Sequence, residues 1–118
     1  MSGLTIRKKQ LGGGVILINV SGFLDAHTFG EMENEIDNLF RKQIYKIIVR
    51  LDEVDYISSA GAGVFIGAIG TATSNGGNIV LLSPSPSVKE VFDLLGLSQI
   101  FPVVSAEKEA LSYFSGNR

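Results

Sequence analysis

The stretch Ser58–Phe65, with the sequence SSAGAGVF, combines hydroxyl side chains with glycines. It lies between a run typical of a buried strand and a run typical of a buried helix. We expect Ser59 at or next to the N-cap of this helix, where a hydroxyl accepts a hydrogen bond from an unpaired backbone N–H group. Gly61 and Gly63 leave those N–H groups open, and a helix N-terminus favours an anion. Ser59 is therefore either an ordinary helix cap or a hydroxyl that can carry a phosphate.

Gly61 and Gly63 also match the first glycines of a dinucleotide-binding motif, but the rest of that motif is missing. Its third glycine would stand at position 66, which is Ile66. The acidic residue expected about twenty positions further on is replaced by the run 81–83, which carries no acid. No glycine is followed by lysine, so the phosphate-binding loop of NTPases is missing too. The sequence disfavours a nucleotide cofactor and ATP hydrolysis.

A nucleophile, a base and an orienting acid could be assembled from Ser59, His27 and Asp25, as in a serine hydrolase. The sequence has no Gly-x-Ser-x-Gly nucleophile motif, and a lone histidine before a helix is more often a surface or capping residue. A small hydrolase is thus the less favoured alternative, and the chain is predicted not to be an enzyme. With one histidine and no cysteine, the acidic run 52–55 indicates a polar turn rather than a metal site, and no cofactor is expected.

Hydrophobic periodicity and turn residues predict the elements that position this stretch. The expected elements are strands over 4–11 and 15–20, a helix over 28–42, a strand over 47–51, a helix over 61–74, a strand over 78–83, a helix from 86 that stops at Gly96, an edge strand over 100–104 broken by Pro102, and a last helix. Thr28, Ser85 and Ser105 are the expected caps of the other helices.

This order predicts an α/β domain with a mixed, mostly parallel sheet, an N-terminal antiparallel hairpin around Gly12–Gly14 and about four packing helices. The small residues of the helix over 61–74 suggest close packing on the sheet. The turns at 52–61 and 83–86 follow two parallel strands, at the edge where α/β sheets usually place their sites. We expect Ser59 on that edge.

Length and composition limit the functions that this chain can have. Its 118 residues fit a single domain over 1–118. A net charge of −2 argues against direct nucleic-acid binding, and the short basic groups indicate solvated faces. The weakly polar run 60–72 is too short to span a bilayer, which needs roughly twenty residues, so no membrane partner is expected. The start of the sequence lacks the apolar segment of a signal peptide, which predicts a cytoplasmic location.

Three segments together resemble the STAS domain of bacterial anti-sigma factor antagonists. They are VSGFLDAHT at 20–28, IVRL at 48–51 and VDYISSAGAG at 54–63. The likeness covers nearly the whole chain and extends to the helix after Ser83 and to the leucine-rich stretch from Leu94 to Phe101. The serine-centred turn is its most specific element, because the other segments indicate fold more than function.

The resemblance implies a phosphorylation switch. In the family, an anti-sigma factor that is also a serine kinase phosphorylates the serine that matches Ser59, with Ser58 as the alternative acceptor here. The unmodified antagonist binds the anti-sigma factor and frees the sigma factor, and a protein serine phosphatase resets the modified form. The partner-binding residues implied are Asp25, Ser58, Ser59, Gly61 and Gly63.

This chain departs from the family motif at one position, where Ser58 replaces the usual aspartate. The change removes a negative charge beside the phosphate site, which eases phosphate accommodation and weakens recognition by the kinase. It leaves open a second role, since STAS domains also act as unphosphorylated scaffolds or sensor modules in signalling complexes.

Overall fold

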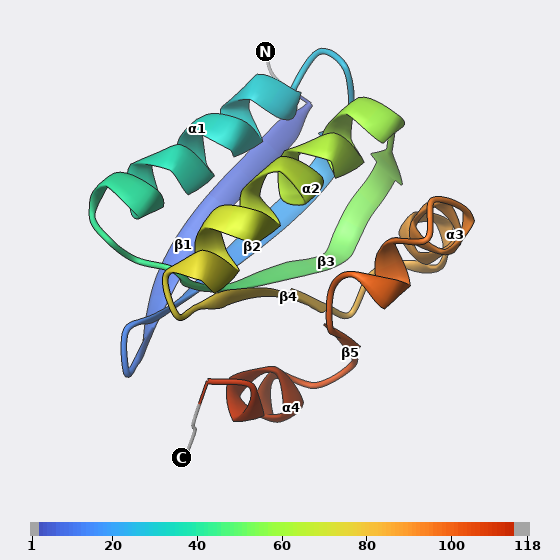
Figure 1. The fold of residues 1–118 in the computed structure, drawn as a ribbon. Helices are drawn as coiled ribbons and strands as arrows, with labels where there is room; N and C mark the ends of the chain where they lie inside the picture. Colours follow the sequence, from blue (N-terminus) through green and yellow to red (C-terminus); the bar gives the residue numbers. More distant parts are fainter. Residues whose placement is uncertain (1–2, 115–118) are drawn as a thin grey trace.

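The structure, a computed structural model, describes residues 3–114 (Figure 1). The strands are β1 (Leu4–Gly12), β2 (Val15–Leu24), β3 (Lys46–Ile57), β4 (Asn78–Leu82) and β5 (Val103–Val104), and the helices are α1 (Phe29–Arg41), α2 (Ser59–Ser74), α3 (Pro86–Leu94), the short 3₁₀ helix η1 (Leu97–Gln99) and α4 (Glu107–Ser112). The predicted order of strands and α-helices is confirmed, and η1 is an addition that the sequence pattern did not indicate.

One mixed sheet organises the molecule, with the strand order β1-β2-β3-β4-β5. β1 and β2 are antiparallel, whereas each later pair of neighbouring strands is parallel. Parallel neighbours need a crossover connection, which α1, α2 and the α3–η1 segment provide. The predicted α/β class, the N-terminal hairpin and the edge position of the last strand are confirmed.

The helices cover the two faces of the sheet unequally, as Figure 1 shows. α1 and α2 lie side by side on one face, α3 flanks them, and α4 lies on the opposite face. Alternate β2 residues divide between the two sides: Ile16 and Ile18 belong to the larger core under α1 and α2, and Leu17 belongs to the smaller core with Ala110 of α4. The face under α4 is referred to below as face B.

Strands β2 and β3 continue further than predicted. β2 ends at Leu24 rather than near residue 20, and β3 ends at Ile57 rather than near residue 51. Two irregularities in their ladder allow pairing to continue, one between Asn19 and Ser21 and one between Gly22 and Phe23. The acidic run 52–55 is therefore part of a strand, and the turn predicted over 52–61 is reduced to Ser58, because β3 ends at Ile57 and α2 begins at Ser59.

The predicted caps of α1 and α3 form other hydrogen bonds instead. The Thr28 hydroxyl donates to the carbonyl oxygen of Phe23 (2.8 Å) and accepts from the backbone N–H of Asp25 (3.0 Å). The Ser85 hydroxyl donates to the carbonyl oxygen of Val54 (2.8 Å). Thr28 and Ser85 do hold the predicted N-cap positions of α1 and α3, but their hydroxyls tie a loop to a strand end instead of bonding to helix N–H groups.

The C-terminal elements differ from the prediction in their limits. β5 is only Val103–Val104, because η1 and the turn after it occupy the preceding residues. The N-cap of α4 is Ala106 and not Ser105. Gly96 ends α3 as predicted, in the left-handed conformation with φ 73°.

Candidate functional site

The ends of β2 and β3 bring Asp25 and the Ser58–Ser59 pair to one edge of the sheet. Leu24 is in register with Ile57, and the backbone N–H of Ser58 donates to the carbonyl oxygen of Leu24 (3.0 Å). Because the strands are parallel, Asp25 and Ser58 both emerge at the carboxyl edge, as Figure 1 shows for the start of α2. The edge predicted for the site is the edge on which these residues lie.

Ser58, and not Ser59, is the N-cap of α2. Its backbone is extended (φ −99°, ψ 172°), and its hydroxyl accepts a hydrogen bond from the backbone N–H of Gly61 (3.2 Å). Its side chain is only partly accessible. The expectation that Ser59 itself caps the helix is wrong, although Ser59 does lie next to the cap as the first residue of α2.

Ser59 is exposed, and within residues 3–114 no hydrogen bond engages its hydroxyl. It lies in the first turn of α2. The backbone N–H groups of a first turn have no hydrogen-bond partner within the helix and carry partial positive charge. A phosphoryl group on Ser59 would therefore meet open space and favourable dipoles. No acid lies in the first turn of α2 to repel it.

The two motif glycines have different structural roles. A Cβ on Gly61 would overlap the carbonyl oxygen of Leu24 and lie 2.9 Å from its Cγ, so only glycine lets α2 approach the end of β2 this closely. A Cβ on Gly63 would meet nothing within 4 Å. Gly63 is exposed, as are Gly67 and Gly70 further along the helix. Close packing on the sheet, predicted for the small residues of α2, thus explains Gly61 but not these three.

The Asp25 carboxylate organises the loop between β2 and α1. Its Oδ1 accepts hydrogen bonds from the backbone N–H groups of His27 (2.9 Å) and Thr28 (3.2 Å) and from the Thr28 hydroxyl (3.3 Å). These donors, the His27 N–H foremost, lower the pKa of Asp25 below its usual value. Asp25 is ionised at neutral pH, and its hydrogen bonds orient it at the same edge of the sheet as Ser58.

The hydrolase arrangement of Ser59, His27 and Asp25 does not form. The hydrogen bond from His27 to Asp25 comes from its backbone N–H and not from the imidazole. Among the described residues no hydrogen bond links the His27 ring to Ser59. A serine nucleophile needs such a base, so the geometry gives this alternative no support.

Two aromatic residues at this edge were not predicted from the sequence to belong to the site. Phe23 is 49% exposed and Tyr56 is 50% exposed, and they are in register on β2 and β3. Each directly precedes a buried residue of the same strand, Leu24 or Ile57. Because side chains alternate along a strand, both residues lie on face B. The same alternation would have predicted their exposure from the sequence if the predicted strands had reached residues 24 and 57.

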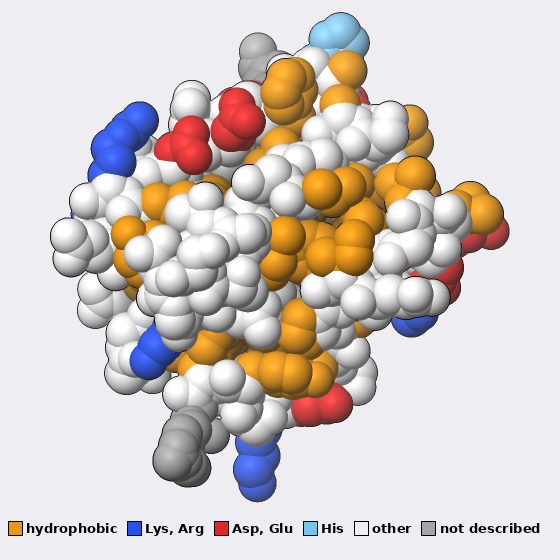
Figure 2. All heavy atoms as spheres, in the orientation of Figure 1, with side chains coloured by type: hydrophobic (Ala, Val, Ile, Leu, Met, Phe, Trp, Pro, Cys, Tyr) orange, Lys and Arg blue, Asp and Glu red, His pale blue; other side chains and the backbone are white. Residues whose placement is uncertain are grey.

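Other surface features lie along α2 and α3. Figure 2 shows hydrophobic side chains gathered between α2 and α3. Ile66 of α2 is 45% exposed, and Ile69 and Val91 are half-buried against the larger core. α3 thus leaves part of the apolar surface of α2 accessible to solvent.

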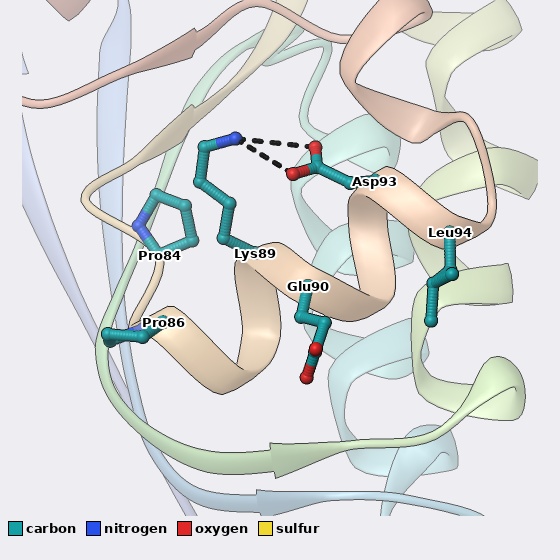
Figure 3. Close-up of a pocket in the computed structure, with 6 residues that line it drawn as sticks. All are labelled: Pro84, Pro86, Lys89, Glu90, Asp93 and Leu94. Carbon is teal, nitrogen blue, oxygen red and sulfur yellow. Dashed lines mark hydrogen bonds and ion pairs between the residues drawn. The ribbon is translucent and has the colours of Figure 1, made fainter.

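A depression of about 660 Å³ on α3 is lined by Pro84, Pro86, Lys89, Glu90, Asp93 and Leu94 (Figure 3). Its one cation, Lys89, is bonded to both carboxylate oxygens of Asp93, at 3.3 and 3.1 Å. Ser98 donates to the same carboxylate (2.6 Å), and these two donors lower the pKa of Asp93. Lys89 and Asp93 are thus engaged with each other, and the carboxylate of Glu90 has no described partner in the depression.

No three His, Asp or Glu side chains of the described part of the chain are grouped to hold a metal ion. Within residues 3–114, no helix is both long and apolar enough to cross a membrane.

The fold and the site define a small α/β domain that presents an exposed serine at a helix N-terminus on the carboxyl edge of its sheet. The family model of the STAS domain matches residues 7–110. The chain therefore belongs to the STAS domain family, as its resemblance predicted.

Known relatives agree with this assignment. The chain is 30% identical over 100 residues to the anti-sigma F factor antagonist of Paenibacillus polymyxa, covering 84% of this chain and 86% of that one. It is 29% identical over 106 residues to the anti-sigma-B factor antagonist of Listeria monocytogenes, covering 90% and 93%.

Solved structures share the fold. The unphosphorylated anti-sigma factor antagonist SpoIIAA matches with a TM-score of 0.82 at 23% identity, over 97% of this chain and 99% of that one. The phosphorylated form of Bacillus SpoIIAA matches with a TM-score of 0.72 at 24% identity, over 92% and 98%. Both forms of that protein thus have the architecture described here.

Proposed function

We propose that this chain is an anti-sigma factor antagonist whose unphosphorylated form binds an anti-sigma factor with serine kinase activity. Binding releases the sigma factor, phosphorylation of Ser59 ends the complex, and a protein serine phosphatase restores it. The chain acts as one STAS domain over 1–118, in the cytoplasm. The names of its relatives support this role in general terms. One observation carries the switch: Ser59 is exposed at the start of α2, its hydroxyl has no hydrogen bond within residues 3–114, and it lies at the same edge of the sheet as Asp25.

The same geometry favours Ser59 over Ser58 as the acceptor. A kinase must reach the hydroxyl from solvent and remove its proton, which requires a side chain free of other bonds. Ser58 is partly buried, and its hydroxyl is engaged with the backbone N–H of Gly61. Phosphorylating Ser58 would disrupt the α2 cap, whereas phosphorylating Ser59 breaks no hydrogen bond among the described residues.

The switch acts at the surface. A phosphate adds a charge of about −1.5 to −2 at neutral pH, and a helix N-terminus tolerates it. Its effect falls on the partner, because a surface that fits the bare Ser59 closely cannot also hold a phosphate without burying an unpaired charge. A penalty of about 2.8 kcal/mol lowers the affinity about a hundredfold, which is enough to exchange partners.

Asp25, Gly61 and Gly63 complete the proposed partner-binding set in different ways. Asp25 presents a negative charge at the same edge, where the kinase can recognise it. Gly61 sets the approach of α2 to β2 and thereby the position of Ser59. Gly63 leaves bare backbone one turn further along the helix, which lets a partner approach closely.

Phosphate mapping by mass spectrometry tests the acceptor. The chain is incubated with ATP and each kinase-type anti-sigma factor of its source organism. We expect phosphate on Ser59 in the wild type and none on the Ser59→Ala variant, whereas a Ser87→Ala control keeps its phosphate. Phosphate on Ser58 alone would contradict the assignment.

Binding measurements test the switch itself. Ser59→Ala should bind the anti-sigma factor like the unmodified chain, and Ser59→Asp should bind at least about tenfold more weakly because it places a charge in the contact. Equal affinities for the two variants would refute the switch.

The replacement of the family aspartate by Ser58 supports a second candidate, an unphosphorylated STAS scaffold or sensor module. This alternative expects a stable complex with a signalling partner and no phosphate on the chain after incubation with any of the kinases. The mass-spectrometric experiment separates the two roles.

A further inference from the structure

The backbone before Phe23 has a conformation that aims this side chain outward. Gly22 has a φ of 99°, and a Cβ there would overlap the carbonyl oxygen of Gly3. The ladder with β3 shifts between Gly22 and Phe23, and the Phe23 N–H donates to the Gly3 carbonyl oxygen (2.7 Å). Such bulges re-aim side chains, so the outward position of Phe23 is set by the fold rather than left to a mobile loop.

Phe23 and Tyr56 form an in-register pair on face B, two residues before Asp25 and Ser58. With 49% and 50% of their surface exposed, they leave large apolar rings in water. α4 does not cover them, because its core contacts end near Leu17 on β2. Rigid exposed aromatics of this kind are the residues on which protein interfaces concentrate their binding energy.

An exposed acidic residue, Glu53, lies on the same face three residues before Tyr56. It pairs with Ser21, two register pairs before Phe23 and Tyr56. Glu53 and Arg7 line the same depression of about 280 Å³ on face B, but they form no ion pair within the described chain. Nearby, Arg50 is paired with Asp52 (3.3 Å), and within the described residues it forms no ion pair with Glu53. A carboxylate on the same face as two exposed rings is suited to a long cationic side chain that stacks on aromatic surfaces.

Arginine has that combination of properties. Its planar guanidinium stacks on aromatic faces and donates hydrogen bonds in a fork that matches a carboxylate, whereas the compact lysine ammonium does so less well. An interface of standard size covers about 800 Å² on each partner, which is more than the Ser58–Ser59 turn alone offers. A protein seated on this turn therefore extends to its immediate neighbours, among which Phe23 and Tyr56 are the exposed aromatics in register.

We propose that Phe23 and Tyr56 are the aromatic anchors of the partner interface and that, with Glu53, they receive an arginine side chain of the bound anti-sigma factor. This inference rests on the proposed function. The partner contacts the Ser59 edge and the adjoining part of face B together, so that phosphorylation acts on one part of the interface and the aromatic anchors on another.

Affinity measurements with the anti-sigma factor that phosphorylates the chain test this proposal. Phe23→Ala and Tyr56→Ala should each raise the Kd about tenfold or more, as truncation of an anchor does. Tyr113→Ala is the matched control, because Tyr113 is also 50% exposed but lies at the C-cap of α4, and the Kd of this variant should stay unchanged. Tyr56→Lys places a like charge before the arginine on an exposed strand position and should weaken binding at least as much.

The Glu53→Gln variant tests the charge. It should raise the Kd and reduce the dependence of the Kd on salt concentration, because one ion pair is lost across the interface. Circular dichroism of each variant confirms that it is folded before binding is compared.

The outcomes separate the two proposals. If the wild type binds and Ser59→Asp does not, but all variants at Phe23 and Tyr56 bind normally, the aromatic-anchor proposal is wrong and the switch stands. If Phe23→Ala and Tyr56→Ala raise the Kd but Glu53→Gln changes neither the Kd nor its salt dependence, the arginine assignment is wrong. A wild-type chain that binds none of the anti-sigma factors would refute the proposed function, and the anchors with it.

Discussion

At the scale of single residues, the two adjacent serines divide capping and modification between them. Ser58 accepts a hydrogen bond from Gly61, and Ser59 is left without one in the described part of the chain. A sequence pattern cannot assign these roles, because either serine is an acceptable N-cap and the choice depends on where β3 ends. Ile57 is the last buried position of that strand, which fixes Ser58 as the cap.

This division predicts unequal costs for two similar substitutions. Ser58→Ala removes the cap and should lower the free energy of unfolding by about 1 kcal/mol. Ser59→Ala removes an exposed, unbonded hydroxyl and should change it by less than about 0.5 kcal/mol. Urea unfolding of both variants measures the difference, and a larger loss for Ser59→Ala would show that the cap is misassigned.

Asp25 predicts a pH dependence at the same scale. Its folded-state pKa is lowered by the N–H donors of its loop, so its stabilising contribution is present above the unfolded-state pKa, ordinarily 3.8, and is lost as the pH falls through the folded-state value. Asp25→Asn keeps an oxygen acceptor but cannot titrate, so it should flatten this part of the acid limb in urea unfolding. Asp25→Ala lacks the acceptor and should be destabilised at neutral pH as well. An unchanged acid limb in Asp25→Asn would contradict this role.

At the scale of elements, α2 contains glycines of two kinds. Gly61 is required by the contact with Leu24, whereas Gly63, Gly67 and Gly70 face open space in a helix interior. Each glycine there costs about 0.8–1 kcal/mol relative to alanine. No close contact in the folded chain requires glycine at these three positions. If position 63 must lack a side chain, the reason therefore lies in contact with a partner.

Alanine substitutions separate packing from partner contact. Gly61→Ala should destabilise the fold by about 1–3 kcal/mol, because the new methyl group overlaps the end of β2. Gly63→Ala, Gly67→Ala and Gly70→Ala should each raise the free energy of unfolding by about 0.5–1 kcal/mol. Under the proposed function, Gly63→Ala should nevertheless bind the anti-sigma factor more weakly than the wild type. A more stable variant with normal binding would remove Gly63 from the partner surface.

The elements also show which parts of the fold could be predicted from sequence. Buried runs such as 47–51 and 79–82 identified the central strands, because a strand covered on both faces is nearly continuous in apolar character. The extension of β3 was missed because only every third residue after Leu51 is buried, and exposed acidic positions between them are typical of a turn. That extension carries Tyr56 to the edge, so the error in strand length also hid one of the aromatic anchors.

At the scale of the whole molecule, the sheet collects residues that are distant in sequence. Asp25 follows β2 and Ser59 begins α2, yet the parallel pairing of β2 with β3 places both at one edge. The order of elements was enough to predict that edge. It was not enough to predict hydrogen-bond partners such as those of Ser85 and Thr28, because these depend on how loops from different strands approach each other.

The position of Ser59 at the surface of a complete fold predicts that phosphorylation leaves the global structure unchanged. The phosphate replaces no buried contact and lies near the N-terminal dipole of α2, so the free energy of unfolding should stay equal or rise by up to about 1 kcal/mol. Urea unfolding of the enzymatically phosphorylated chain against the unmodified chain measures this, with far-UV circular dichroism as the check on secondary structure. The phosphorylated chain should bind the anti-sigma factor about a hundredfold more weakly than the unmodified chain. A marked loss of stability on phosphorylation would instead indicate a switch that unfolds part of the domain, and would contradict a switch confined to its surface.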